Sequence, residues 1–188
     1  MTSPRVLLVC GSLRAGSTNE AALRAALDAA PPGTSGEVFG GMGALPHFNP
    51  DDDRDPPPAP VAALRSAIGA ADAVLFCTPE YAGALPGSFK NLLDWTIGGG
   101  ELSGRPVAWI NVASPAAPAG GADAHASLRK VLGYAGAEIV EEACARVPVT
   151  RPDLGPDGRV RDPALRDRLG APLAALLAAA ARGPAERP

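Results

Sequence analysis

The sequence predicts an α/β fold in which a five-stranded parallel sheet of order 2-1-3-4-5 carries helices on both faces. Three short runs, at residues 5–10, 73–77 and 106–112, are apolar on both faces, as is typical of buried parallel strands. Helical segments follow these runs, so strands and helices alternate along the chain. In a sheet of this order a ligand binds beyond the carboxyl ends of strands 1 and 3, where the order reverses.

Length and charge narrow the class of protein. The chain has 188 residues, enough for one domain with a sizeable core, and we expect a single domain over 1–182 with a frayed tail at 183–188. A net charge of −3 disfavours nucleic acid or an anionic membrane as a partner. No apolar run approaches the ~18 residues of a membrane span. The N-terminus lacks the pattern of a signal peptide, so we expect a cytoplasmic protein.

The first apolar run ends at a glycine, and a helix follows it. We expect this helix to run to about residue 29, with Thr18 or Asn19 as its N-cap. The next predicted elements are a weak strand over 37–39, a long irregular stretch over 40–60 and a helix over 59–70 with Val61, Leu64 and Ile68 on one side. A loop as long as 40–60 is usually functional or covers part of the domain.

The second half of the chain continues the alternation. Pro86 suits the first turn of a helix that we expect to reach residue 97. A further helix ends near residue 135 with Gly136 as a C-cap, and segments 139–140 and 147–149 frame an interrupted last strand. The final helix is predicted over 163–182, with a kink near Pro172.

The cysteines and histidines do not form a pattern that indicates chemistry. Cys10, Cys77 and Cys144 lie far apart without a CxxC motif, and an odd number argues against a disulfide framework. Cys10 and Cys77 fall inside apolar runs and are interpreted as buried core thiols. The two histidines lack the surroundings of a metal site, so no metal is expected.

The loop after the first strand is a candidate anion site. It opens a helix, whose N-terminus presents backbone N–H groups and a favourable dipole to an anion. The spacing Gly11-x4-Gly16 resembles a P-loop, but Ser17 stands where a P-loop needs lysine, and there is no GxGxxG. A hydroxyl-rich loop with one arginine suits a terminal monophosphate, although an ordinary capped turn remains an alternative. The donors are Ser12, Arg14, Ser17, Thr18 and Asn19.

Two further loops should lie beside the first. Thr78-Pro-Glu-Tyr-Ala-Gly83 follows the third strand and could present its backbone and the Tyr81 ring to a planar heterocycle. Tyr81 could equally be a surface aromatic, and Glu80 a solvated turn residue. The loop over 114–121 is rich in proline and glycine, and Gly120-Gly121 could approach a ligand closely.

Four separated motifs resemble the NADPH-dependent FMN reductase family, which includes azobenzene, quinone and chromate reductases. The resemblance covers roughly residues 5–140 in the right order. The motifs are Gly11-Ser-Leu-Arg14 with Ser17 and Asn19, Leu45-Pro-His-Phe-Asn-Pro-Asp51, Thr78-Pro-Glu-Tyr81 with Gly83, and Pro86-Gly-Ser-Phe-Lys-Asn-Leu-Leu-Asp-Trp95.

The resemblance implies a flavodoxin-like three-layer sandwich, bound FMN, and NADPH or NADH as the electron donor. It implies ping-pong transfer through flavin N5 to free flavin, a quinone, an azo compound or a metal oxyanion, with no catalytic side chain. It also implies a homodimer or dimer of dimers that uses segment 86–95. By position, Ser12, Arg14, Ser17 and Asn19 would hold the phosphate, Pro79, Glu80, Tyr81 and Gly83 would line the isoalloxazine, and Ser114, Gly120 and Gly121 would close the other side.

Three positions depart from the family pattern. Ala82 and Ala84 replace an asparagine and a serine, and Asp123 stands where a Gly-Gly-x-Arg pattern has arginine. Because Ala82 removes a polar group near the implied flavin, we expect that restoring asparagine there tightens flavin binding or shifts its potential. The alternative functions are an electron-transfer flavodoxin, which the low aromatic content of 4% disfavours, and a non-catalytic flavin-binding module. A hydrolase would need a nucleophile–base pair, which these loops lack.

Overall fold

The predicted strand order is confirmed by a computed structural model, which describes residues 3–182. The sheet path is β2-β1-β3-β4-β5, and the neighbouring pairs along it are parallel. The predicted frayed tail at 183–188 lies outside the described residues. The strands are β1 (Arg5–Cys10), β2 (Ser35–Val38), β3 (Ala73–Cys77), β4 (Pro106–Asn111), β5 (Glu138–Ile139) and β6 (Ala145–Arg146).

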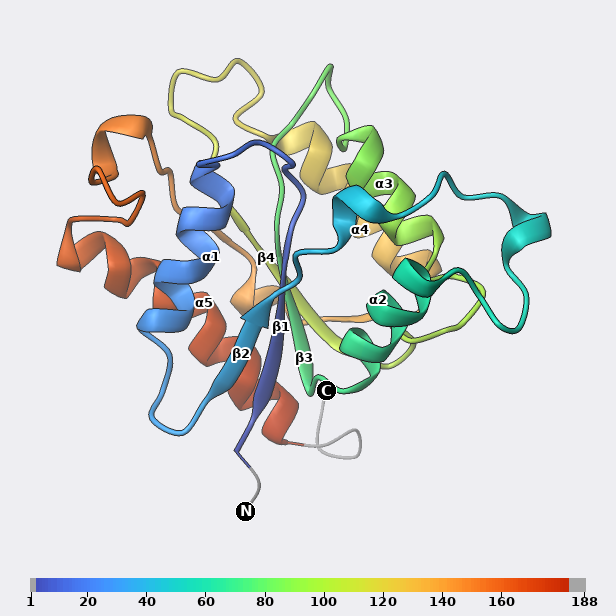
Figure 1. Cartoon of the computed structure of the whole chain (residues 1–188). Helices are drawn as coiled ribbons and strands as arrows, with labels where there is room; N and C mark the ends of the chain where they lie inside the picture. The colour runs from blue at the N-terminus through green and yellow to red at the C-terminus, as the bar shows by residue number, and fades with distance from the viewer. Residues whose placement is uncertain (1–2, 183–188) are drawn as a thin grey trace.

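Helices cover both faces of the sheet, as expected. Helices α1 and α5 pack on one face, and α2, α3 and α4 pack on the other (Figure 1). Pro172 lies inside α5, and the helix continues beyond it. The helices are α1 (Thr18–Asp28), α2 (Ala59–Gly69), α3 (Gly87–Asp94), α4 (Ala122–Tyr134) and α5 (Pro163–Ala181).

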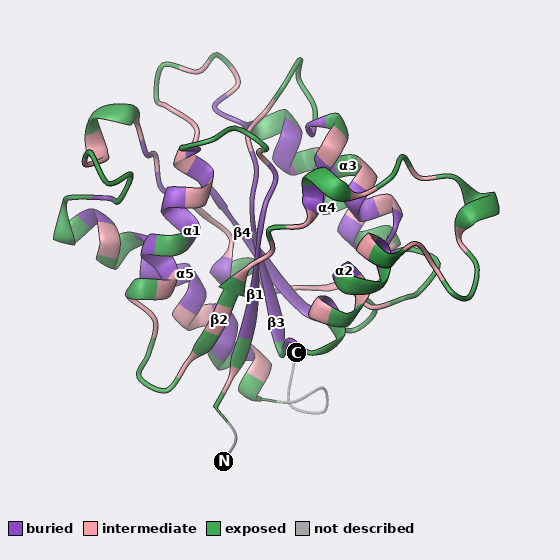
Figure 2. Cartoon of the chain, in the orientation of Figure 1, coloured by how far each residue is buried: buried purple, intermediate pink, exposed green. Residues whose placement is uncertain are grey.

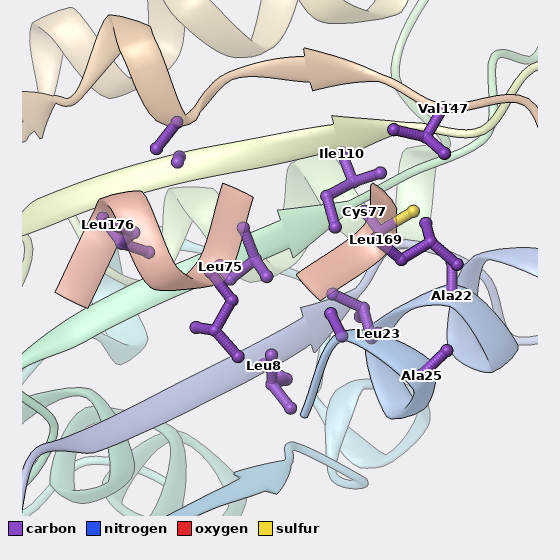
Figure 3. Close-up of a cluster of buried hydrophobic side chains, with 14 of the residues drawn as sticks. Leu8, Ala22, Leu23, Ala25, Leu75, Cys77, Ile110, Val147, Leu169 and Leu176 are labelled. Carbon is purple, nitrogen blue, oxygen red and sulfur yellow. The ribbon is translucent and has the colours of Figure 1, made fainter. Parts of the chain in front are cut away.

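Successive side chains of each central strand belong alternately to two separate hydrophobic cores, one on each face of the sheet. In β1, Leu8 belongs to the cluster under α1 and α5, while Leu7 and Val9 belong to the cluster under α2, α3 and α4. The central strands are buried along their length between the two helix layers (Figure 2). Figure 3 shows part of the first cluster, with Leu75 of β3, Leu23 of α1 and Leu169 of α5 among its labelled side chains. Burial on both faces explains why these strands are continuous apolar runs rather than alternating ones.

The register of β1 and β3 brings the first two loops together. Cys10 is opposite Cys77, so both strands end at the same level of the sheet. The connections after β1, β3 and β4 gather at this end of the molecule (Figure 1). Burial raises the pKa of Cys10 and Cys77, so both thiols are neutral core groups, as the sequence predicts. Cys144 is only partly buried, and its pKa is raised to about 11, chiefly by desolvation.

Several element boundaries differ from the prediction. Ser17, rather than Thr18 or Asn19, caps α1, because its hydroxyl accepts the N–H of Asn19 at 3.2 Å. β2 begins at Ser35, two residues before the predicted start, and pairs with β1 from Arg5 onward.

Helix α3 ends earlier than predicted, because the N–H groups of Thr96 and Ile97 bond three residues back, to the carbonyls of Leu93 and Asp94. The segment over 45–51 binds this C-terminal turn. The Trp95 indole N–H and the Asn91 amide both donate to the Pro46 carbonyl at 2.9 Å. The Asn91 side chain also accepts the N–H of Phe48 at 2.7 Å, and Phe48 packs edge-on against Trp95. Two of the four sequence motifs are therefore partners in a single structural contact.

The last strand is interrupted, as predicted, but its second part starts earlier. The 3₁₀ turn Glu141–Ala143 separates β5 from β6, and β6 pairs with β4 at Ile110 and Asn111. Segment 147–149 is not a strand, although Val147 and Val149 each donate an N–H to the β4 edge. The two acceptors, the carbonyls of Asn111 and Val112, belong to adjacent residues, whereas donors two residues apart in a regular parallel ladder bond to acceptors two residues apart, so the ladder does not continue.

No helix within residues 3–182 is long and apolar enough to cross a bilayer. No cluster of three or more histidine, cysteine, aspartate or glutamate side chains in this range has a metal-binding arrangement.

Candidate functional site

A cavity of about 560 Å³ lies at the carboxyl end of the sheet, at the reversal of strand order. Its volume is within the ~300–1,000 Å³ of small-molecule and cofactor sites. Three of its walls are the predicted loops after β1, β3 and β4. The fourth is the segment that follows β6. The lining residues are Ser12, Arg14, Gly16, Ser17, Thr18, Asn19, Thr78, Pro79, Glu80, Tyr81, Val112, Ala113, Ser114, Ala117, Pro118, Ala119, Gly121, Val149, Thr150 and Arg151.

The first loop presents donors rather than acceptors to the cavity. The Ser17 hydroxyl accepts the Asn19 N–H, and the Ser12 hydroxyl accepts the Arg14 N–H at 3.2 Å. Because each oxygen is already accepting, each hydroxyl proton can point to a ligand. Gly16 has a φ of +63°, which turns the chain into α1 at the cavity wall. This end of the cavity therefore suits an anion with several oxygens.

Asn19 also lines the cavity, and its side chain is held by contacts with Ser17 and Cys77. It is 6% exposed, its amide lies 3.4 Å from the Ser17 hydroxyl, and its oxygen accepts the Cys77 thiol at 3.3 Å. These contacts connect the start of α1 to the end of β3. Asn19 thereby fixes the Ser17 cap, and part of its amide remains available at the cavity floor.

Charge is unevenly distributed along the cavity. Arg14 and Arg151 line the end next to α1, and within residues 3–182 neither guanidinium has a hydrogen-bond or ion-pair partner. Among the described lining residues, Glu80 is the one carboxylate, and it lies at the other end. The cavity is therefore cationic at the loop of α1, and its lining also includes apolar side chains such as Pro79 and Val112.

Glu80 has a structural partner that the sequence does not reveal. Its Oε2 accepts the backbone N–H groups of Asp123 and Ala124 at 3.0 and 3.1 Å. Glu80 thus acts as an N-cap for α4 from a separate loop, where a carboxylate also complements the helix dipole. It fixes the second loop against the third, in addition to lining the cavity.

Ala82 and Gly83 do not line the cavity. Tyr81 and Ala84 exchange backbone hydrogen bonds at 3.0 and 3.1 Å, and the two residues between them have φ values of +52° and +70°. Positive φ at both central positions is the type I′ hairpin turn, which prefers Asn-Gly. The family's asparagine at this position therefore has a backbone explanation, and Ala82 occupies a strained conformation at an exposed tip.

We now expect Ala82→Asn to change stability rather than flavin binding. Asparagine tolerates left-handed backbone better than alanine, so the free energy of unfolding should rise by about 1 kcal/mol. Urea denaturation measures this rise, and Ala84→Asn, at an exposed neighbour without positive φ, should give no gain. Tighter FMN binding by Ala82→Asn with unchanged stability would instead place this side chain at the flavin.

The third loop is held by its neighbours on β4 and α4. The Asn111 amide donates to the Gly120 carbonyl at 2.9 Å and accepts the Ala113 N–H at 2.9 Å. His125 Nδ1 donates to the Gly121 carbonyl at 2.6 Å, and burial lowers the pKa of His125. Gly121 lines the cavity with a φ of +77°, whereas Gly120 does not line it, because its α-carbon faces the Arg146 guanidinium.

Ten of the thirteen predicted binding residues line one cavity, and Ala82, Gly83 and Gly120 do not. Sequence reasoning missed Thr78, the apolar residues of the β4 loop, and the segment Val149–Arg151. The signal for this last segment was present, because it directly follows the interrupted fifth strand, whose carboxyl end lies at the same edge.

The fold and sequence match known flavoenzymes. Residues 4–148 match the family model described as NADPH-dependent FMN reductase. An NAD(P)H-dependent FMN reductase from Pseudomonas aeruginosa is 34% identical over 174 residues, covering 92% of each chain. A quinone reductase from Pseudomonas putida is 35% identical over 146 residues, covering 76% of this chain and 74% of that one.

A solved structure gives the same assignment. FerB, a flavoenzyme NAD(P)H:(acceptor) oxidoreductase from Paracoccus denitrificans, superposes with a TM-score of 0.81 at 30% identity, covering 95% of this chain and 98% of that one. The predicted resemblance, the flavodoxin-like fold and the class of cofactors, FMN with NAD(P)H, are thereby confirmed. The chain belongs to the NADPH-dependent FMN reductase family and is an FMN-dependent oxidoreductase.

Proposed function

We propose that residues 1–182 act as one FMN-binding domain that passes reducing equivalents from NADPH or NADH to a small quinone-type acceptor. The observation that carries this proposal is the two-ended chemistry of the cavity. One end offers hydroxyl protons and cationic side chains at a helix N-terminus, and the other offers apolar and backbone surfaces. A flavin mononucleotide has the matching shape, with a dianionic phosphate at one end and a flat ring at the other.

The residues present fit FMN. At the phosphate end, Ser12, Arg14, Ser17 and Thr18 would bind the phosphate oxygens, while Asn19 supports the cap. At the ring end, Pro79, Tyr81, Ser114 and Gly121 would border the isoalloxazine. Ala82, Gly83 and Gly120 would shape the loops without touching the ring. FMN would supply the two-electron redox chemistry, and the protein would supply binding, orientation and electrostatics.

The side chains around the ring end act by positioning. Glu80 holds the second loop to α4, and His125 and Asn111 hold the carbonyls of Gly121 and Gly120. These hydrogen bonds connect the second and third loops to β4 and α4, so they hold the two loops in place at the cavity. None of these groups needs to act as a nucleophile or as a proton donor.

We also propose the class of acceptor and the order in which the two substrates bind. Relatives from Pseudomonas putida and Escherichia coli are named quinone reductases, which supports a quinone as the acceptor. We propose that nicotinamide and acceptor use the same cavity in turn. We therefore expect parallel lines in double-reciprocal plots of rate against NADPH at several quinone concentrations. Intersecting lines would exclude alternating use of one site.

Assembly and location are also proposed. We propose a homodimer or dimer of dimers that uses segment 86–95, as the family resemblance implies. Light scattering of the purified protein measures this directly, and a monomeric mass would reject it. Three free cysteines and the use of NAD(P)H favour the cytoplasm, a reducing compartment.

The absorption spectrum of the purified protein tests the proposed function. The protein is measured as purified, after addition of FMN, and after anaerobic addition of NADPH. Flavin bands near ~450 nm that bleach with NADPH and return with a quinone are the expected result. Bound flavin that neither NADPH nor NADH bleaches would mean another donor or a binding role, and absence of FMN binding would reject the cofactor assignment.

A further inference from the structure

Arg151 enters the cavity from outside the part of the chain that carries the family motifs. The family match covers residues 4–148, and the segment that follows β6 lies beyond it. Arg151 nevertheless lines the same cavity as Arg14. A methyl group built on Gly16 would lie 3.6 Å from Arg151 Nη1, so this guanidinium lies beside the loop that opens α1.

The backbone under Arg151 is fixed from both sides. Before it, the Val149 N–H donates to the Val112 carbonyl at 3.2 Å. After it, the Asp153 carboxylate accepts the backbone N–H and the hydroxyl of Thr150 at 2.7 and 2.6 Å, which closes a capping box. These hydrogen bonds lower the pKa of Asp153, so the turn keeps its carboxylate at neutral pH. Arg151 therefore projects from a defined turn rather than from a loose loop.

The charge of Arg151 is not neutralised by the protein. Asp153, two residues away, uses its carboxylate on Thr150. In the described part of the chain, no carboxylate lies within ion-pairing distance of Arg151, and the cavity's Glu80 is occupied at the N-terminus of α4. An arginine with free donors beside a helix N-terminus and hydroxyl donors is arranged for an anion.

We infer that Arg151 is a second cationic ligand for a phosphate monoester at the α1 loop and makes the site selective for the phosphorylated flavin. This inference rests on the proposed function, since it takes FMN as the occupant. Arg14 and Arg151 reach the loop from different connections, so together they match the two negative charges of a terminal phosphate. Riboflavin, which lacks the phosphate, gains nothing from either cation.

Flavin binding to the apoprotein measures this selectivity without any turnover. FMN and riboflavin are titrated by flavin fluorescence into the parent, Arg151→Gln and Arg151→Lys. We expect Arg151→Gln to weaken FMN about tenfold and to leave riboflavin within about twofold, at a cost typical of one charge-assisted hydrogen bond. Arg151→Lys, which keeps the charge but not the planar fork, should recover part of the affinity.

A matched control removes an equal charge elsewhere. Arg168 is exposed on α5 and does not line the cavity, so Arg168→Gln should bind both flavins as the parent does. The 2′-phosphate of NADPH is another phosphate monoester, so the rates of flavin reduction by NADPH and NADH are compared in the same variants. We expect their ratio to be unchanged by Arg151→Gln.

The outcomes separate this inference from the proposed function. The inference is supported if Arg151→Gln loses FMN affinity and keeps its riboflavin affinity, while Arg168→Gln binds both flavins as the parent does. An unchanged FMN-to-riboflavin ratio rejects it while leaving the proposed function intact, and a changed NADPH-to-NADH ratio with unchanged FMN affinity assigns Arg151 to the electron donor instead. A parent protein that binds neither flavin rejects both the proposed function and this inference.

Discussion

Gly11→Ala is expected to lower the free energy of unfolding by about 2–3 kcal/mol, because there is no space for a methyl group at this position. A Cβ built on Gly11 would lie 2.3 Å from Thr78 Oγ1 and 2.6 Å from Thr78 Cβ. Both strand ends are rigid here, since the Gly11 N–H donates to the Cys77 carbonyl at 2.8 Å and Thr78 is 2% exposed. The methyl group must therefore push the ends of β1 and β3 apart.

Urea denaturation of the apoprotein measures this effect, with Gly40→Ala as the matched control. No heavy atom lies within 4 Å of a Cβ built on Gly40, and its φ is not positive, so its substitution should be nearly neutral. We also expect Gly11→Ala to lose FMN binding, because the displaced strand end carries the α1 loop. A Gly11→Ala protein as stable as the parent would show that the two loops do not approach this closely.

Arg14→Ala is expected to weaken FMN binding by about 2–3 kcal/mol, the value of hydrogen bonds to a charged group. This corresponds to roughly 30- to 150-fold in the dissociation constant. Arg14 is exposed and unpaired among the described residues, so its removal breaks no protein contact and should leave the free energy of unfolding unchanged. Riboflavin binding should also be unchanged.

Fluorescence titration of the apoprotein with both flavins measures the effect. Arg54→Ala removes the same charge from an exposed position outside the cavity and is the control for long-range electrostatics. Equal FMN affinities in the parent and Arg14→Ala would mean that the phosphate does not bind at the α1 loop. A loss shared by Arg54→Ala would attribute the effect to net charge alone.

Local sequence was sufficient for the sheet and most of the helices. Strands β1, β3 and β4 are buried on both faces, so each is a continuous apolar run that can be recognised without knowing its neighbours. The alternation with helices then restricts the order of the sheet, and the order determines which loops share an edge. For this reason the three loops of the cavity could be named from the sequence.

The ends of helices and strands, and the conformations of turns, could be predicted less well from the sequence. The contact of Asn91 and Trp95 with Pro46 joins segments more than forty residues apart. The break in the fifth strand depends on which of its N–H groups bond to β4. Ala82 has a positive φ because it lies in the turn of a hairpin. Local patterns do not specify such pairings.

The sequence by itself determined the fold, the family and the position of the proposed anion-binding loop, because these depend on periodicity and on motifs that are continuous in the chain. Only the tertiary structure decided the contacts of Glu80 and the place of Arg151 in the cavity. Glu80 caps a helix that begins 42 residues later, and Arg151 reaches a loop near the other end of the chain. Both roles depend on where a side chain points once distant segments have packed, and packing is a property of the whole core rather than of any segment.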